Sequence, residues 1–225
     1  MLIVSEAWKA TYPGAAQGLL VMRNVANLEH HPKLEKRKAE LEEQLRARFA
    51  GYDKAALTAL PSVQPYVAYY GQFKKTYHVL LQLESVALKG KPLPRVAALV
   101  EAMFMAELKN QLLTAGHDLE ALREPLRLDV ATGDERYILL NGKEETLKAG
   151  DMFIADAEGV TSSILYGPDY RTRITPDTHT ALFTVYAPPR IEPAAVRQHL
   201  EDIRAYVMLI APEAAVEVRK VYGAE

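Results

Sequence analysis

The sequence predicts an α+β fold in which a hairpin-rich mixed β-sheet packs against helices. Helical periodicity dominates residues 31–108, whereas from residue 126 to residue 187 apolar side chains recur with a period of two between Gly-containing turns. Helical periodicity returns at residues 193–210. A block of helices followed by a block of hairpins is typical of α+β proteins rather than of alternating βαβ folds.

In the first half, two short strands should precede a series of helices. Residues 2–8 and 18–27 have strand character, with a turn at "TYPG" between them. Residues 31–50 predict a helix, because Pro32 lies in its first turn and Gly51 follows its end. The pattern predicts further helices at residues 53–60, 63–70, 76–88 and 94–108, and a polar connection at residues 110–125.

In the second half, the turns "TGDE", "NGKE", "KAGD", "AEGV" and "YGPD" separate the expected strands. A helix at residues 193–210 and a strand "VEVRKVY" end the chain. We therefore expect residues 1–225 to form one domain whose sheet, at residues 126–187, packs on the helices of residues 76–108. The expected core comprises Leu80, Leu83, Val96, Leu99, Val100, Met103, Leu128, Ile138, Ile154, Ile164, Leu182 and Val185.

Composition excludes several classes of function. The 225 residues contain no cysteine, which rules out disulfides, thiolate nucleophiles and Cys-ligated zinc. His78 and Glu84 are six positions apart, which is not a metal-ligand spacing, so we expect no metal site. No Gly-rich phosphate-binding or dinucleotide motif is present, and we expect no cofactor. The start lacks a signal-peptide pattern and no window is long and apolar enough for a membrane span, so we expect a cytoplasmic protein.

The net charge of −2 argues against a general nucleic-acid coat but allows a local basic patch. Basic residues gather in "HPKLEKRKAELEEQLRARF", "QFKKTYH" and "DYRTRIT". The first stretch is interpreted as a solvated helix, since an apolar stripe runs through alternating charges. The tRNA- or phosphate-binding candidates come from the other two stretches: Lys74, Lys75, Arg171 and Arg173.

A colinear series of short motifs makes the second half recognisable. Its pieces are "IADAEG" at residues 154–159, "TPDT" at 175–178 and "AP" at 187–188. Upstream lie "LPRVAALVEAMFMAEL" and "GHDLEAL". Together they resemble the B3/B4-type editing (tRNA-binding) domain of the bacterial phenylalanyl-tRNA synthetase beta subunit. The resemblance is strongest at about residues 66–188, with residues 1–60 and 193–210 as extensions. "GKPLP" at residues 90–94 resembles free-standing, synthetase-free members of that family.

The resemblance implies a domain that takes the 3′ end of tRNA and hydrolyses a wrongly attached amino acid. Such sites position a water and offer backbone N–H groups to the oxyanion, so they leave little trace in sequence. In the synthetase domain a glutamate reads the hydroxyl of misattached tyrosine, and Thr184 stands at the corresponding position. The family's Val-Asp-x-x-Asn reads Val100-Glu101-Ala102-Met103-Phe104 here, which keeps an acid and loses the amide. We therefore do not expect tyrosine editing by the family route.

Two functions of different classes remain open. One is a stand-alone aminoacyl-tRNA deacylase acting in trans on a small or medium side chain. The other is a non-catalytic module that binds tRNA, an amino acid or a protein. For either, "TPDTHT" is interpreted as a pocket rim, although a plain turn into the next strand is the simpler alternative. The pocket candidates are Glu101, Thr161, Ser162, Ser163, Asp177, Thr178 and Thr184.

Overall fold

Eleven strands are found in residues 2–223, which are the residues that the computed structural model describes. They are β1 (Leu2–Val4), β2 (Ala16–Arg23), β3 (Leu113–Asp118), β4 (Leu126–Val130), β5 (Arg136–Ile138), β6 (Glu144–Thr146), β7 (Met152–Asp156), β8 (Gly159–Ser163), β9 (Gly167–Pro168), β10 (Thr180–Ala187) and β11 (Ala215–Gly223). They form a five-stranded sheet of order β1-β4-β7-β8-β9, a four-stranded sheet of order β11-β2-β10-β3, and a hairpin of β5 and β6.

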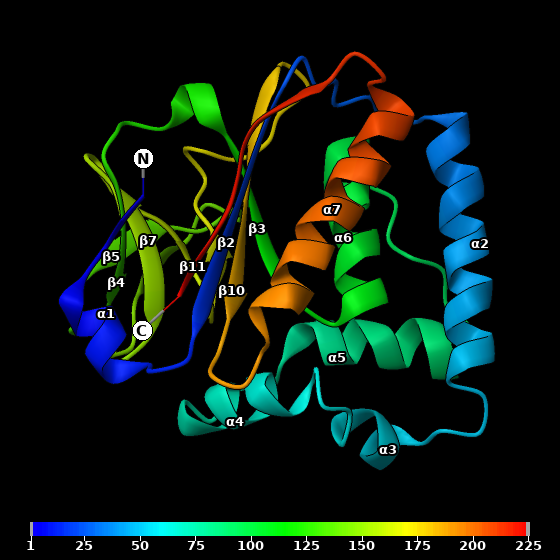
Figure 1. The fold of residues 1–225 in the computed structure, drawn as a ribbon, viewed down its shortest axis with the longest axis horizontal. Coiled ribbons are helices and arrows are strands. Elements are labelled where there is room, and N and C mark those ends of the chain that lie inside the picture. The colour runs from blue at the N-terminus through cyan, green and yellow to red at the C-terminus, as the bar shows by residue number, and fades with distance from the viewer. Residues whose placement is uncertain (1, 224–225) are drawn as a thin grey trace.

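The helices lie mainly on one side of the four-stranded sheet (Figure 1). They are α1 (Glu6–Thr11), α2 (Pro32–Arg48), α3 (Lys54–Thr58), α4 (Gln64–Gln72), α5 (His78–Leu83), α6 (Ala98–Asn110) and α7 (Pro193–Ile210). A π-helical turn (Glu84–Leu88) extends α5, and a 3₁₀ turn (Leu119–Ala121) follows β3. Figure 1 shows α2, α6 and α7 on the side of this sheet opposite β4 and β7, while α3, α4 and α5 run across one end.

Helix α7 packs closely on β2 because one side of each element is shaped for the other. Val196, Leu200, Ile203 and Val207 recur at helical spacing and are all buried. Opposite them, a Cβ added at Gly18 would lie 2.7 Å from Cγ1 of Val196. The glycine therefore allows the backbone of β2 to approach the helix.

The α+β class and most elements agree with the sequence prediction. The helix at Pro193–Ile210 begins and ends at the expected residues, and α2 differs from its prediction by two residues or fewer at each end. The expected first strand is too long, because the hydroxyl of Ser5 accepts a hydrogen bond from the N–H of Trp8 and starts α1 there.

Two predictions about the sheet are wrong. The connection expected at residues 110–125 contains β3, whose polar side chains Thr114 and His117 are buried and hydrogen-bonded. The single sheet expected at residues 126–187 is divided among three sheets, because β5 pairs only with β6, and β10 pairs with β2 and β3 rather than with the preceding hairpins. Strand β1 completes the five-stranded sheet, and strands β2 and β11 complete the four-stranded sheet. That residues 1–225 form one domain stays a prediction.

The predicted core is confirmed except at three positions. Nine of its twelve residues are buried, Val100 is half-buried, and Val96 and Ile138 are exposed. Val96 lies in the loop before α6, where its N–H donates to a carboxylate. Ile138 lies in the two-stranded hairpin outside both larger sheets. Apolar character and periodicity could not separate these two from true core residues.

Candidate functional site

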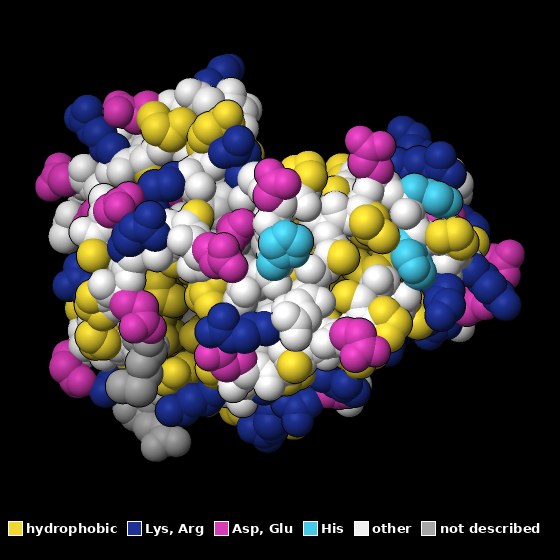
Figure 2. Space-filling view, turned by 90° about the horizontal axis from the view of Figure 1, so that it is seen from above, with side chains coloured by type: hydrophobic (Ala, Val, Ile, Leu, Met, Phe, Trp, Pro, Cys, Tyr) yellow, Lys and Arg dark blue, Asp and Glu magenta, His cyan; other side chains and the backbone are white. Residues whose placement is uncertain are grey.

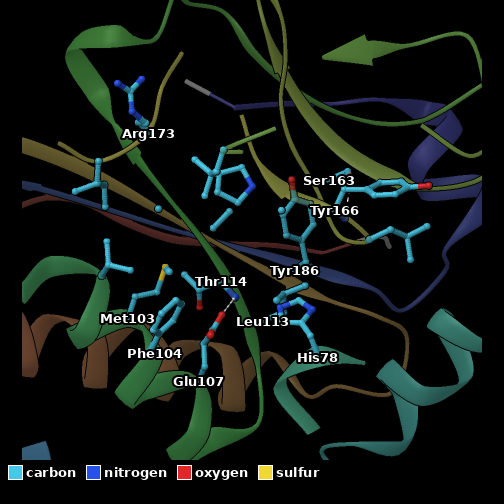
Figure 3. Close-up of a pocket in the computed structure, with 18 of the residues that line it drawn as sticks. His78, Met103, Phe104, Glu107, Leu113, Thr114, Ser163, Tyr166, Arg173 and Tyr186 are labelled. Atoms are coloured by element: carbon cyan, nitrogen blue, oxygen red, sulfur yellow. Dashed lines mark hydrogen bonds between the residues drawn. The ribbon is translucent and has the colours of Figure 1, made fainter. Parts of the chain in front are cut away.

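A pocket of about 520 Å³ opens between α5, α6, the β8–β9 region and the edge of β3 that faces away from β10, which Arg173 bridges at His117 (Figure 3). Most of its wall is apolar, as is usual for sites that hold a small organic group. Polar side chains, including those of His78, Glu107 and Arg173, also line the pocket. The lining residues are His78, Gln82, Val100, Met103, Phe104, Glu107, Leu113, Thr114, Ala115, Gly116, Leu140, Ser163, Leu165, Tyr166, Gly167, Pro168, Arg173, Ile174 and Tyr186.

Strand β3 directs backbone N–H groups away from its partner β10. It is the edge strand of its sheet. The N–H of Thr114 donates to Glu107 at 2.8 Å, and the N–H of Asp118 donates to the carbonyl of Thr172 at 2.8 Å, so both point away from β10. Alternate residues of a strand direct their N–H groups to the same side. The N–H of Gly116, midway between them, therefore points toward the side on which the pocket lies.

Gly116 lets side chains of the pocket wall pack directly against the backbone of β3. A Cβ added there would lie 2.8 Å from Cδ1 of Ile174 and 3.3 Å from Sδ of Met103, which both line the pocket. Its backbone dihedrals lie outside the left-handed region, so the need for glycine at this position is one of space. The wall thus combines a backbone donor of β3 with the apolar ends of Ile174 and Met103.

A carboxyl group, Glu107, lies in the floor of the pocket. Its side chain extends from α6 toward β3, and Oε1 accepts the N–H of Thr114 (Figure 3). The residue is 1% exposed, and burial raises the pKa of the carboxyl to about 8, against the smaller opposing effect of the Thr114 bond. Within residues 2–223, no hydrogen bond to Oε2 and no ion pair of Glu107 is found. The acid is therefore mostly protonated at neutral pH.

His78 and Gln82 of α5 add two further acceptors. The phenol of Tyr70 donates to the carbonyl of Ile164 at 2.5 Å, so its only hydrogen is used. Tyr70 Oη can then only accept from Nδ1 of His78, 3.3 Å away, which leaves Nε2 of the neutral imidazole as an acceptor. Burial lowers the pKa of His78 to about 4, so the ring is neutral at physiological pH. Oε1 of Gln82 is buried with no hydrogen-bond partner among the described residues.

Ser163 joins the pocket to a second buried acid. Its hydroxyl accepts the N–H of Tyr166 at 3.2 Å. Behind it, Asp151 accepts the phenol of Tyr69 at 2.8 Å, and burial raises the pKa of Asp151 to about 7, opposed by the hydrogen bond from Tyr69. Ser163 is therefore a hydroxyl whose surroundings include a carboxyl that titrates near neutrality.

Two cationic side chains border the pocket. The guanidinium of Arg173 stacks over the ring of Tyr170, with 3.7 Å between Cζ and the ring centroid. Nζ of Lys75 lies 4.1 Å from the ring centroid of Tyr166, a lining residue. Figure 2 shows Lys and Arg side chains interspersed with Asp and Glu on the face it displays. The face that Figure 2 displays is therefore not a broad basic surface.

Of the seven pocket candidates from the sequence, only Ser163 lines this pocket. Thr161 and Ser162 are buried and bond within the fold, to Ile154 and Tyr186. Thr184 is fully buried beside the carbonyl of Ala115, on the β10 side of that strand.

The remaining three candidates also have structural partners or lie outside. Glu101 receives Nζ of Lys38 at 2.6 Å and the N–H of Val96 at 2.9 Å. Thr178 accepts the N–H of Thr175 and donates to Asp118, which closes the turn before β10. Asp177 is exposed in that turn. The predicted convergence of Thr178, Thr184 and Glu101 on this cavity is therefore wrong: each satisfies its polar atoms elsewhere.

The four basic candidates divide into two pairs. Arg173 lines the pocket and Lys75 lies beside it, as described above. Arg171 is held by Asp156 at 2.8 Å and by the carbonyl of Ala121 at 2.8 Å, so its guanidinium stabilises the loop. Lys74 is exposed in a turn with φ of 55°.

Sequence reasoning missed Glu107, His78 and Gly116. A signal for Glu107 was present: Val100, Phe104 and Glu107 are spaced by four and three residues and share one face of α6. An acid on an apolar face is unusual enough to mark a site. No local pattern distinguishes Gly116, because its role depends on an edge strand that the sequence did not reveal.

The described residues hold no group of three or more His, Asp or Glu arranged to bind a metal. Among them, too, no helix has the length and hydropathy needed to cross a membrane.

Comparison with known proteins identifies the fold and the family. The B3/4 domain family matches residues 66–207, and no curated protein sequence matches the chain. The chain is similar to a crystal structure of an N-terminal fragment of the phenylalanyl-tRNA synthetase beta-subunit from Pyrococcus horikoshii, with a TM-score of 0.50 and 13% identity. The match covers 96% of this chain and 50% of that fragment, so this chain spans half its length. Since the family matches well over half of its residues, the chain belongs to the B3/4 domain family.

Proposed function

We propose that this chain hydrolyses the ester bond of a mischarged aminoacyl-tRNA, acting in trans. The observation that carries the proposal is the pocket, in which an apolar wall, a backbone N–H of Gly116 directed to the pocket side of β3 and a bordering cation at Arg173 occur together. Membership of the B3/4 family and the fold shared with a phenylalanyl-tRNA synthetase fragment also support this proposed function. The substrate proposed is an ester of a small or medium amino acid, which the volume of the pocket accommodates.

The chemistry proposed relies on positioning rather than on a strong nucleophile. The side chain of the amino acid lies against Met103, Phe104 and Ile174, and its ester carbonyl accepts the N–H of Gly116. One donor to a developing oxyanion contributes about 3 kcal/mol. Ser163, the pocket hydroxyl near Asp151, is the candidate to hold the attacking water. Holding water and ester together supplies on the order of 7–11 kcal/mol of barrier reduction.

The tRNA is proposed to approach over Arg173 and Lys75. Both cations lie at the border of the pocket and not in its floor. In this arrangement they contact the phosphates beside the terminal ribose when the ester lies inside the pocket. Both also lie over aromatic rings, and flat cationic and aromatic surfaces are suited to stacking of unpaired bases. A small number of such contacts predicts binding that weakens with salt, though less steeply than for a broad basic surface.

The test combines hydrolysis and binding on the same protein. Purified chain is mixed with a panel of tRNAs charged with correct and incorrect amino acids, and loss of each aminoacyl bond is followed against spontaneous hydrolysis. Binding of the uncharged tRNAs is measured in parallel. Faster loss of at least one mischarged tRNA supports the proposal. Binding without accelerated loss of any ester contradicts it and supports the non-catalytic binding module instead.

A further inference from the structure

The floor of the pocket contains polar side-chain atoms that receive no hydrogen bond from the described residues. Glu107 is 1% exposed, lines the pocket, and has one oxygen held by Thr114 and the other without a hydrogen-bond partner among residues 2–223. Gln82 contributes a buried Oε1 that likewise has no partner in the described chain. His78 contributes Nε2, because its other ring nitrogen is the donor to Tyr70. Two acceptors and a carboxyl that becomes a third acceptor when it ionises therefore border the same space, on two facing helices.

No cation of the described residues neutralises this end of the pocket. Arg173 approaches from the opposite side, as Figure 3 shows, and its Nη1 donates to the carbonyl of Tyr170 at 2.6 Å. On α6, the next cation along is Lys109, which pairs with Asp202 of α7 at 2.8 Å. A buried carboxyl without a cationic partner is costly to ionise. A bound ligand can therefore supply the cation that Glu107 lacks.

The number of acceptors indicates which chemical group fits. A primary ammonium has three N–H donors and one positive charge, whereas a hydroxyl has a single donor and no charge. Only the ammonium can use all three acceptors and also compensate an ionised Glu107. Hydrogen bonds in which both partners are charged are about twice as strong as neutral ones.

We propose that Glu107, Gln82 and His78 form a binding site for the primary ammonium group of the ligand. The inference deepens the proposed function, on which it rests for the identity of that ligand: the ammonium belongs to the esterified amino acid. Two sources share this chemistry, the α-ammonium and a side-chain ammonium. On binding, the proton of Glu107 leaves to solvent and the carboxylate pairs with the ammonium.

Four primary amides of six carbons separate the possible ligands. L-norleucinamide carries an α-ammonium, 6-aminohexanamide a terminal ammonium, 6-hydroxyhexanamide a terminal hydroxyl, and hexanamide neither. Calorimetric titration of the wild-type chain at about pH 6.5 keeps both amines charged. We expect one of the two amines to bind at least about tenfold more tightly than hexanamide, and which one does so identifies the source. Repeating the titration in two buffers of different ionisation enthalpy should show release of about one proton per ligand.

Glu107→Gln is the matched variant. The amide keeps the acceptor for Thr114 and the shape of the carboxyl, but it neither ionises nor carries charge. Amine binding should fall at least about tenfold and the proton release should disappear, while the affinity for hexanamide stays the same. Glu101→Gln is the control, because this buried carboxyl lies on the same helix but outside the pocket. Thermal unfolding of both variants confirms that they are folded.

The proposal is overturned if no compound binds, if hexanamide or the hydroxyl compound binds as tightly as the amines, or if Glu107→Gln binds the amines like wild type. These outcomes are separable from failure of the proposed function. A chain that hydrolyses aminoacyl-tRNA but does not prefer amines keeps the activity and loses the ammonium site. A chain that prefers amines through Glu107 but hydrolyses no ester keeps the site and loses the activity.

Discussion

Oε1 of Glu107 accepts a 2.8 Å hydrogen bond from the backbone N–H of Thr114, and this bond joins the helix that forms the floor of the pocket to the edge of the sheet that forms its wall. Both groups would otherwise be buried polar atoms without a partner, which costs about 1–3 kcal/mol for each group. The same bond fixes one oxygen of Glu107, so only the other is available to a ligand.

Replacing Glu107 by Gln should change how stability depends on pH. The pKa of this carboxyl is raised to about 8 in the folded chain from an ordinary value of 4.5, so the folded state holds its proton more tightly than the unfolded state. The associated stability is fully present below pH 4.5 and is lost as pH rises through 8, at up to about 1.4 kcal/mol per pH unit. Glu107→Gln lacks this loss.

The measurement is chemical denaturation of both proteins between about pH 5 and 9. Other groups near the pocket titrate in both proteins, including Asp151 and His78, whose pKa values are shifted by burial to about 7 and about 4. The difference between variant and wild type isolates Glu107. The variant should gain stability relative to wild type as pH rises. A difference that stays constant with pH contradicts the assignment.

Gly116→Ala should lower the rate of ester hydrolysis with little loss of stability. The added methyl group displaces the flexible ends of Ile174 and Met103, which can move, and these two side chains line the pocket beside Gly116. If the displaced side chains keep the ester from the Gly116 N–H, the lost contact predicts a decrease of about 100-fold or more. Gly71→Ala is the control, since a Cβ at Gly71 meets no atom within 4 Å. Equal rates for the two variants would argue against a role for Gly116.

Arg173→Ala and Arg171→Ala should have different effects although the two residues are neighbours in sequence. Arg173 borders the pocket, so its loss should weaken tRNA binding and reduce the salt dependence of the binding constant by about one contact. Arg171 bonds to the carboxylate of Asp156 and to the carbonyl of Ala121, so its loss should destabilise the fold by about 1–3 kcal/mol. Binding at several salt concentrations and denaturant unfolding of both variants test this contrast. If Arg171→Ala weakened tRNA binding and Arg173→Ala destabilised the fold, the two roles would be exchanged.

Thr178→Val should reduce stability and leave hydrolysis unchanged. The hydroxyl bonds to the N–H of Thr175 and to Asp118, and both partners remain behind when it is removed. The expected cost is about 1–3 kcal/mol. Hydrolysis assayed well below the melting temperature should match wild type, because Thr178 does not line the pocket. A lower rate at full folding would restore Thr178 to the site.

Local sequence signals predicted the elements whose ends are chemically marked. Pro32 and Pro193 open their helices, and the Gly-containing turns separate the hairpin strands. The pairing of β10 with β2 and β3 could not be predicted, because no local turn fixes its register. The paired residues are more than a hundred positions apart for β2 and more than sixty apart for β3.

The candidate site was predicted only in part for the same reason. Ser163 and Arg173 are adjacent to recognisable turns, and both line the pocket. Thr178 and Thr184 are polar for structural reasons, as capping and buried hydrogen bonding account for their hydroxyls. Glu107 and Gly116 acquire their roles from the edge position of β3, which only the assembled sheet reveals.

The measurement that tests the central claim most directly is the first-order decay of a panel of mischarged aminoacyl-tRNAs with and without the wild-type chain, under single-turnover conditions. The account predicts that decay of at least one small or medium aminoacyl ester accelerates by a hundredfold or more, consistent with one oxyanion donor and a positioned water. Decay at the spontaneous rate for every ester in the panel would contradict it.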